Sequence, residues 1–455
     1  MRDFWEVEDE KYVFRFRNAK ALLGDYHELE NQEIYFCPYA ELNDPAEGNM
    51  NVYWQGDRIV WVNLFKHYFK CLFLSWTLIC LGDERYKEIP IWGTWREFNL
   101  DSMITELFDS DEMKFVLHMI GDYEDRVSEN ELQVYLFLIN SRAFEIIINH
   151  LGMNADIGKN KRSFPKYDDM DGMHTYSEAD RKQIFEVMNE AIYAQKEALL
   201  QGVQRDEKTR FMLIDYPQCY IKSIWELMFP KWYVSSFCRT YDNSRMWSSY
   251  ADDHKGACLI FKVRAGTGGD AIRLYTCHGY SSVSGHKYDF YNEPLREINY
   301  SNSYEAINFF EMLGNVPGGM LRELFTDDEG RVSSYWVYDD SDEWRNRYWG
   351  HMDDTVCTKT EDWKEERECR VVLESGMVMS YDNTDERRVK YDFKELAGII
   401  LGMRIAEEDK REIVSILHQK CEENNVLEFP IYQEKIDKET GRIKIMRLAV
   451  IGGEK

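Results

Sequence analysis

The run of residues 246–261 constrains the fold more than any other segment, because it specifies a helix, the end of that helix and the strand that follows. Three residues at its start have side chains that cap helices, namely Asp242, Asn243 and Ser244. Gly256 stands where a left-handed residue commonly ends a helix. Residues 257–263 are mostly apolar and predict a buried strand.

The predicted helix has one amphipathic face. Its members follow one another at i, i+3, i+4 and i+7 and are Trp247, Tyr250, Ala251 and His254. In most proteins such a stripe packs on a sheet. The tryptophan, tyrosine and histidine also carry polar atoms that need partners when buried, so the same face could line a ligand cleft. The sequence leaves both interpretations open.

The composition predicts a large, acidic globular protein. The chain has 455 residues, 44% of them hydrophobic, which is enough for two or three folded units or for one domain with a long insertion. Lys and Arg number 56 against 82 Asp and Glu, for a formal net charge of −26. This charge argues against generic binding to a nucleic-acid backbone and against anionic membrane surfaces. Any contact with nucleic acid has to be local.

The sequence predicts a cytoplasmic protein. Its acidic N-terminus lacks the apolar core of a secretory signal, and the longest apolar stretch, residues 71–81, is too short to span a bilayer. Ten cysteines are scattered without any Cys-x-x-Cys pair, which indicates reduced thiols. No group of His and Cys has the spacing of metal ligands, so no metal is predicted.

The order of patterns predicts an α+β core that is interrupted by helices. Residues 1–82 open with strand-like and helix-like runs, residues 83–228 are mostly helical, and strand-like runs return within residues 229–455. We therefore expect the first and third parts to form one α+β core, and the middle part to be a large helical insertion. Motifs of P-loop, Rossmann, α/β-hydrolase and zincin enzymes are absent from the sequence.

Two acidic residues near the end of the chain could carry chemistry. In the strand-like run 366–373, Glu366, Glu368 and Arg370 alternate with apolar residues and share one face. Carboxylates two residues apart on a strand lie about 7 Å from each other, and one of them binds a proton more tightly unless a cation compensates. A solvated sheet edge is the ordinary alternative.

The first part of the chain offers further polar candidates. Asn43 and Asp44 precede a proline and suit an Asx-turn, which is the leading interpretation. Arg15 and Arg17 alternate with phenylalanines, so both guanidinium groups leave the first strand on one face. Such forks can bind a pyrophosphate or a carboxylate, or they can pair with the acidic surface.

Five blocks taken together resemble one family. They are Phe14-Arg15-Phe16-Arg17, Glu33-Ile34-Tyr35-Phe36 with Asn43-Asp44-Pro45, the run from Met246 to Gly256, Glu366-x-Glu368-x-Arg370, and Ile399-Ile400-Leu401-Gly402. The family is the bacterial one catalogued as domain of unknown function 2971. The sequence departs from its pattern at Cys37, where serine is usual, at Ala46, where an aromatic residue is usual, and at Ser249, where histidine is common.

The same block order is remotely similar to the ADP-ribosyltransferase superfamily. That resemblance implies a split mixed and antiparallel sheet and activity on NAD. It implies catalytic roles for Arg17, Glu366 and Glu368, with the strand at residues 35–37 or Ser235 and Ser236 alongside. We further expect a catalytic role for Tyr250, and cofactor contacts from Arg15, Asn43, Asp44, Trp247, His254 and Arg370. We expect one pocket, with Arg17 and Glu368 together in it, to be surrounded by Arg17, Asn43, Asp44, Trp247, Tyr250, His254, Glu366, Glu368 and Arg370.

Three functions follow as expectations. The first is transfer of ADP-ribose from NAD to a macromolecule, or hydrolysis of NAD, by a toxin or an anti-phage defence effector. The second is a non-enzymatic sensor that binds a partner protein through the helical insertion. The third, a metal-dependent nuclease that uses Asp44, Glu366 and Glu368, fits the acidic composition less well.

Overall fold

The chain folds into two compact units in this computed structural model. The structure describes residues 4, 11–93, 98–121, 126–152, 207–338, 341–376 and 378–452, together with 182–183, 185–190, 192–194 and 197.

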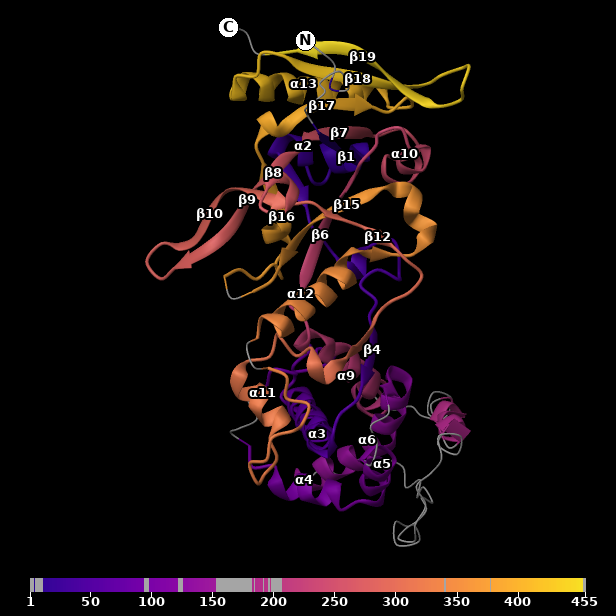
Figure 1. Cartoon of the computed structure of the whole chain (residues 1–455), viewed down its shortest axis with the longest axis vertical. Coiled ribbons are helices and arrows are strands. Elements are labelled where there is room, and N and C mark those ends of the chain that lie inside the picture. Colours follow the sequence, from indigo (N-terminus) through magenta and orange to yellow (C-terminus); the bar gives the residue numbers. More distant parts are fainter. Residues whose placement is uncertain are drawn as a thin grey trace. The chain divides into compact units, whose positions relative to one another are not determined.

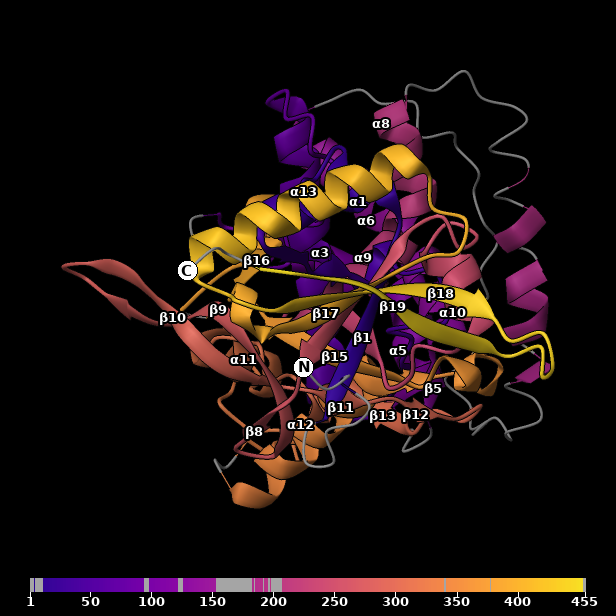
Figure 2. The same cartoon turned by 90° about the horizontal axis from the view of Figure 1, so that it is seen from above.

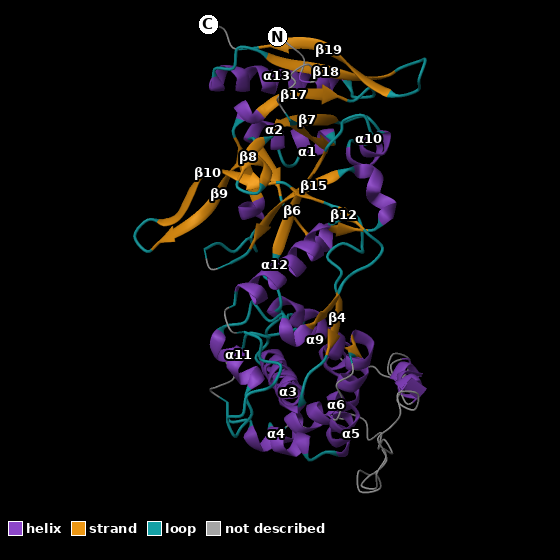
Figure 3. Cartoon of the chain, viewed as in Figure 1, coloured by secondary structure: helices purple, strands orange, loops and turns teal. Residues whose placement is uncertain are grey.

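The first of the two units, here called the sheet unit, comprises residues 1–49, 230–304 and 352–455. The second, here called the helical unit, comprises residues 50–229 and 305–351. Strands dominate the former and helices the latter (Figure 3). Helices with mixed and antiparallel sheets make this an α+β protein, as the sequence predicts.

A nine-stranded sheet forms the centre of the sheet unit. Its order is β11-β15-β6-β1-β7-β17-β18-β19, with β3 also paired to β6. The strands span Arg296–Glu297 (β11), Glu368–Glu374 (β15), Trp232–Cys238 (β6), Tyr12–Arg17 (β1), Ala257–Lys262 (β7), Leu396–Leu401 (β17), Phe429–Ile436 (β18), Ile443–Ile451 (β19) and Cys37–Pro38 (β3). All neighbours are antiparallel except β17 and β18.

Helices cover both faces of this sheet. On one face α13 (Glu407–Asn424) packs with α1 (Ala19–Leu23) and α2 (Glu28–Asn31) against a core that includes Val13, Leu259 and Val371 (Figure 2). On the other face α10 (Ser244–Tyr250) packs Met246 and Trp247 against Phe14 and Phe16. Each strand alternates between the two cores because successive side chains of a strand point in opposite directions.

A smaller sheet continues the same unit. Its order is β10-β9-β16-β2, and β8 also pairs with β9. The strands span Gly285–Pro294 (β10), Gly269–Ser281 (β9), Arg388–Tyr391 (β16), Glu33–Tyr35 (β2) and Arg264–Gly266 (β8). The hairpin of β9 and β10 extends well beyond the other strands of this sheet (Figure 1). A two-stranded parallel pair, β12 (Asn299–Tyr300) with β14 (Thr358–Lys359), lies in the same unit.

Residues 246–261 fold largely as predicted, into a helix followed by a strand. Asn243 caps α10 by accepting a hydrogen bond from the backbone N–H of Arg245, and β7 follows. The helix, however, ends at Tyr250, and the left-handed residues are 252–254 rather than Gly256. The prediction for Gly256 was wrong because this glycine serves a close approach: a Cβ atom there would lie 2.1 Å from the carbonyl oxygen of Arg17.

The helical unit begins at Met50, ahead of the boundary expected at residue 83. The long helix α3 (Arg58–Cys80) belongs to it and packs against α5, α6 and α11. Its other helices include α4 (Asp101–Phe108), α5 (Asp111–Gly121), α6 (Glu129–His150), α8 (Glu207–Arg210), α9 (Tyr216–Ile224) and α11 (Gly318–Phe325). Three short strands, β4 (Asn51–Trp54), β5 (Val127–Ser128) and β13 (Ala306–Asn308), form a small sheet. The helical insertion predicted at 83–228 includes residues 153–206, most of which lie outside the described residues.

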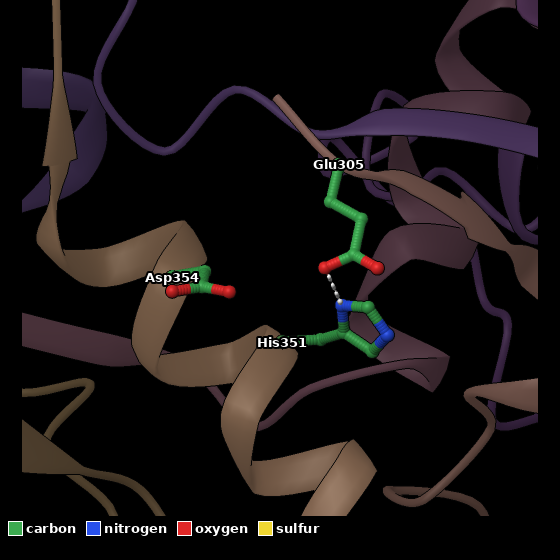
Figure 4. A group of neighbouring side chains, drawn as sticks. All are labelled: Glu305, His351 and Asp354. Atoms are coloured by element: carbon green, nitrogen blue, oxygen red, sulfur yellow. Dashed lines mark ion pairs between the residues drawn. The ribbon is translucent and has the colours of Figure 1, made fainter. Parts of the chain in front are cut away.

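Helix α12 (Asp342–Cys357) starts in the helical unit and ends in the sheet unit. Its residue His351 pairs with Glu305, with 3.7 Å between Nδ1 and the carboxylate, as Figure 4 shows. Asp354, drawn with them, belongs to the sheet unit. Across the described residues, every helix is too short or too polar to cross a membrane.

Candidate functional site

Five charged side chains in the sheet unit form one buried cluster. This charge cluster consists of Glu47, Lys359, Glu366, Glu368 and Arg370, each at most 5% exposed. The ammonium group of Lys359 lies at its centre, 2.8 Å from a carboxylate oxygen of Glu366, 2.8 Å from one of Glu368 and 3.1 Å from one of Glu47. Three carboxylates thus converge on a single cation.

Arg370 is the second cation of the cluster and binds two of its three carboxylates. Its Nε atom lies 2.5 Å from the second oxygen of Glu368, and its Nη2 atom binds the second oxygen of Glu47. Its Nη1 atom donates a hydrogen bond of 2.9 Å to the carbonyl oxygen of Val356. Both carboxylate oxygens of Glu368 are therefore bound by cations.

The local backbone explains how distant residues meet here. Strand β15 places Glu368 and Arg370 on one face by its two-residue period. Glu366 ends the 3-10 helix η8 (Glu361–Glu366), and Arg367 between it and the strand is left-handed, with φ of 47°. This bend allows Glu366 and Glu368 to reach the same ammonium group.

Glu47 comes from the turn that the sequence predicts. Asp44 accepts a hydrogen bond of 2.9 Å from the N–H of Ala46 through its side chain, and its carbonyl accepts one of 3.1 Å from the N–H of Glu47. The Asx-turn is therefore present. The other oxygen of the Asp44 carboxylate is buried and has no hydrogen-bond partner among the described residues.

The electrostatics of the charge cluster leave it with an excess of negative charge. When all five groups are ionised, three negative charges face two positive ones. Burial opposes the charged form of Glu368, but Arg370 and Lys359 outweigh it and lower its pKa to about 2. Burial raises the pKa of Glu47. For Lys359 burial favours the neutral form, yet the three carboxylates raise its pKa above the usual value.

A half-buried rim connects the cluster to the surface. Tyr250 donates a hydrogen bond of 3.0 Å to Glu366, and Asn43 donates one of 2.7 Å to the Tyr250 hydroxyl. Burial raises the pKa of Tyr250, so its hydroxyl stays a donor. Beside them Trp363 lies between two cations, 4.9 Å from Lys359 and 4.8 Å from the exposed Arg245.

The structure therefore unites several of the predicted site residues. Glu366, Glu368, Arg370, Tyr250 and Asn43 are linked by direct contacts, and Asp44 lies in the turn that supplies Glu47. The carboxylates of β15 do not line a solvated sheet edge, which was the alternative for this strand.

Arg15 and Arg17 do not join this group. Glu368 lies opposite Cys238 in the sheet, and Cys238 lies opposite Phe14, so these three side chains share one face. Both arginines alternate with Phe14 and project from the other face. The expected pairing of Arg17 with Glu368 in one pocket is therefore wrong.

On that other face the two arginines have their own partners. Arg15 is buried and binds the hydroxyl of Ser235 and the carbonyl of Ser236. Arg17 forms a two-pronged ion pair with the buried Glu28, in which Nε lies 2.7 Å from the carboxylate. Arg17 thus has the salt-bridged role that the sequence left open, whereas Arg15 is hydrogen-bonded to neutral groups of the sheet unit.

Trp247 and His254 form a separate polar centre. Trp247 is fully buried in the core beneath α10 and donates to the carbonyl of Tyr241. The Nδ1 atom of His254 lies 2.8 Å from Glu434, whose other oxygen accepts a hydrogen bond from the N–H of Met403. For Trp247 the core interpretation of the amphipathic stripe holds, whereas Tyr250 faces the charge cluster.

Lys359 and Glu47 were not identified from the sequence. Each is a single charged residue outside any recognisable motif, at a distance of 312 positions from the other. A weak signal was present, because two carboxylates on one strand face require a cation and Lys359 is the first lysine upstream of η8. Its ammonium also stands where a divalent cation would bind three carboxylates, so the charge cluster does not offer an open metal site.

Comparisons with known proteins identify part of the chain. Neither the curated proteins nor the solved structures include a match to it. A family model matches residues 246–371, which contain most of α10, Lys359, η8 and the first half of β15. The segment that supplies most of the charge cluster thus matches the family described as "Protein of unknown function (DUF2971)", the family that the sequence blocks predict.

Proposed function

We propose that the charge cluster and its rim form an ADP-ribosyltransferase-like site that acts on NAD. The observation that carries this proposal is the excess carboxylate charge next to the half-buried Tyr250. Burying charge without a balancing partner is costly, so such an arrangement is more typical of a functional site than of a stabilising one.

The chemistry of NAD cleavage suits this charge. When the bond between nicotinamide and ribose breaks, its electron pair leaves with nicotinamide and positive charge develops on the ribose. Fixed carboxylates stabilise that charge, as they do in glycosidases. Water or a nucleophile of a macromolecule then forms the new bond to the ribose carbon and loses its proton.

The contacts suggest different roles for the two glutamates of this strand and bend. Glu366 reaches the rim through Tyr250 and is the better candidate to face the ribose. Both oxygens of Glu368 are held by Lys359 and Arg370, so it is a positioning residue. Because Arg17 is on the other face, we assign binding of the pyrophosphate to Arg245, which lies next to Trp363.

This assignment has a direct biochemical test. The purified full chain is titrated with NAD in a calorimeter and then incubated with NAD alone and with a bacterial extract. Release of nicotinamide without extract indicates hydrolysis, and labelled macromolecules indicate transfer. If NAD neither binds nor loses nicotinamide under either condition, the proposal fails.

The alternative is a partner-binding module without enzymatic activity. The two functions differ in what expression in a bacterial host does. A toxin or defence effector of the proposed kind harms the host through the charge cluster, and Glu366→Gln relieves the harm. Harm that persists in Glu366→Gln and disappears when residues of the helical unit are changed favours the partner-binding module.

A further inference from the structure

The small sheet of the sheet unit carries a ladder of aromatic rings on one face of its hairpin. The aromatic ladder consists of Tyr280, His286, Tyr288, Tyr275 and Phe290. Successive ring centroids in this order lie 5.3, 6.4, 5.7 and 5.2 Å apart. The ladder crosses from one strand to the other and follows the hairpin toward its base.

The pairing of β9 with β10 explains why these rings meet. Tyr280 lies opposite His286, and Tyr275 lies opposite Phe290. A bulge between Lys287 and Tyr288 shifts the register by one residue on β9, which brings rings on both sides of it to the same face. The backbone hydrogen bonds between β9 and β10 therefore fix the positions from which these rings project.

Most of the ladder is open to solvent. Tyr280 is 62% exposed, Tyr288 42% and Tyr275 39%. Soluble proteins rarely leave several neighbouring aromatic rings in water unless they contact a partner. The opposite face of the sheet is core: Leu274 and Val389 are buried there.

Cations accompany the rings. Arg273 lies over the ring of Phe290, with 5.7 Å between its guanidinium carbon and the ring centroid. The exposed Lys390 of β16 is opposite Tyr275 in the register, so it shares the face of the ladder. Between residues 271 and 292 the chain has one acidic residue, Asp289, although its overall charge is −26. Arg273 and Lys390 are thus the cations that this face offers to phosphate groups, and Glu33 of β2 lies opposite Lys390 in the register.

We propose that this face binds single-stranded nucleic acid, with bases stacked on the aromatic ladder and phosphates near Arg273 and Lys390. Exposed rings on a sheet, flanked by cations, are the surface on which several single-strand-binding folds stack bases. A duplex hides its bases, so single strands are the preferred ligand. The proposal does not depend on activity toward NAD.

The test is a fluorescence-anisotropy titration of the full chain with labelled 20-nucleotide single strands of DNA and RNA and with a 20-base-pair duplex. We expect one or both single strands to bind more tightly than the duplex. The double substitution Tyr275→Ala and Tyr288→Ala should weaken binding by about 10-fold or more, because each stacked base contributes a factor of roughly 5 or greater. Tyr275→Phe with Tyr288→Phe is the matched control and should bind within about 3-fold of the unchanged chain, because the rings remain.

Salt dependence tests the cations separately. Lys390→Gln should lower the steepness of the plot of log affinity against log salt by about 0.7, the value for one phosphate contact to a single strand. No binding at low salt, equal binding of the duplex, or equal loss in the Ala and Phe variants would overturn the proposal. So would an alanine variant whose nucleic-acid affinity is unchanged and whose self-association is lost, since the face would then be a protein interface. Circular dichroism and thermal melting establish that each variant is folded.

Discussion

Glu366 accepts a hydrogen bond of 3.0 Å from the hydroxyl of Tyr250, and this bond is the link between a buried charge cluster and the surface of the sheet unit. On its other oxygen Glu366 binds Lys359, which also binds Glu368 and Glu47. A group that approaches Tyr250 therefore meets a network with excess negative charge rather than an isolated carboxylate.

Removal of the central cation should destabilise the sheet unit strongly. Lys359→Met leaves three buried carboxylates without their shared partner, and the loss of one member of a buried ion pair costs about 3 to 5 kcal/mol. The measurement is denaturant unfolding followed by circular dichroism. Lys364→Met is the control, because Lys364 is exposed and its replacement should change stability by less than about 0.5 kcal/mol. Equal stability of the two variants would contradict the described network.

Stability should fall in acid partly through Glu368. Its pKa is lowered from 4.5 to about 2 in the folded chain, so its contribution is present above pH 4.5 and is lost as the pH falls from about 4.5 toward 2. A difference of roughly 2.5 pKa units corresponds to about 3 kcal/mol. Glu47 acts with the opposite sign because burial raises its pKa. The informative quantity is therefore the difference between the unchanged chain and Glu368→Gln, which should shrink over this pH range. A difference that does not depend on pH would contradict the ion pairs of Glu368.

The loop after α10 lies so close to Gly402, the residue that follows β17, that we expect no side chain to be tolerated at position 402. A Cβ atom there would lie 2.2 Å from the carbonyl oxygen of His254, which is backbone and cannot move aside cheaply. Gly402→Ala should therefore lower the melting temperature by several degrees, because a loss of about 1 kcal/mol already shifts the melting of a domain by a few degrees. Gly376→Ala is the matched control, since a Cβ atom there meets nothing within 4 Å. Similar melting of both variants would contradict the close approach.

A smaller side chain on the apolar face of β15, the strand that carries Glu368, should lower the free energy of unfolding. Val371 is fully buried in the core beneath α13, so Val371→Ala should destabilise the chain by about 1 to 3 kcal/mol through the cavity it leaves. Val283 is 95% exposed at the tip of the hairpin, and Val283→Ala should have no measurable effect on stability. Denaturant unfolding compares the two. If both substitutions have the same cost, Val371 does not face the core.

Local patterns in the sequence were enough to predict most of the elements around the charge cluster. Alternation placed Glu368 and Arg370 on one face of β15, and the Asn-Asp-Pro run gave the turn before Glu47. What the pattern of one strand cannot give is the face that it shares with another strand. Arg17 and Glu368 were expected together, but the register through Cys238 puts them on opposite faces. Register depends on tertiary pairing, which no local pattern encodes.

The role of Lys359 could not be predicted from a local sequence pattern either. Its role arises only when the chain brings three carboxylates from two distant segments to one point. The aromatic ladder could not be predicted either, because the order of its rings depends on a bulge in the pairing of β9 with β10. The end of α10 also differs from the local pattern: the left-handed residues lie at 252–254, and Gly256 instead approaches the carbonyl oxygen of Arg17.

The rate of nicotinamide release from NAD by Glu366→Gln, compared with Glu365→Gln, tests the central claim most directly. Both substitutions remove one carboxylate charge from adjacent residues, but Glu366 is buried in the charge cluster and Glu365 is exposed. We expect Glu365→Gln to release nicotinamide at the rate of the unchanged chain. The rate for Glu366→Gln should be lower by about 100-fold or more, as when one stabilising group is removed from a transition state. Equal rates in the two folded variants would contradict the claim that the charge cluster is the reactive centre.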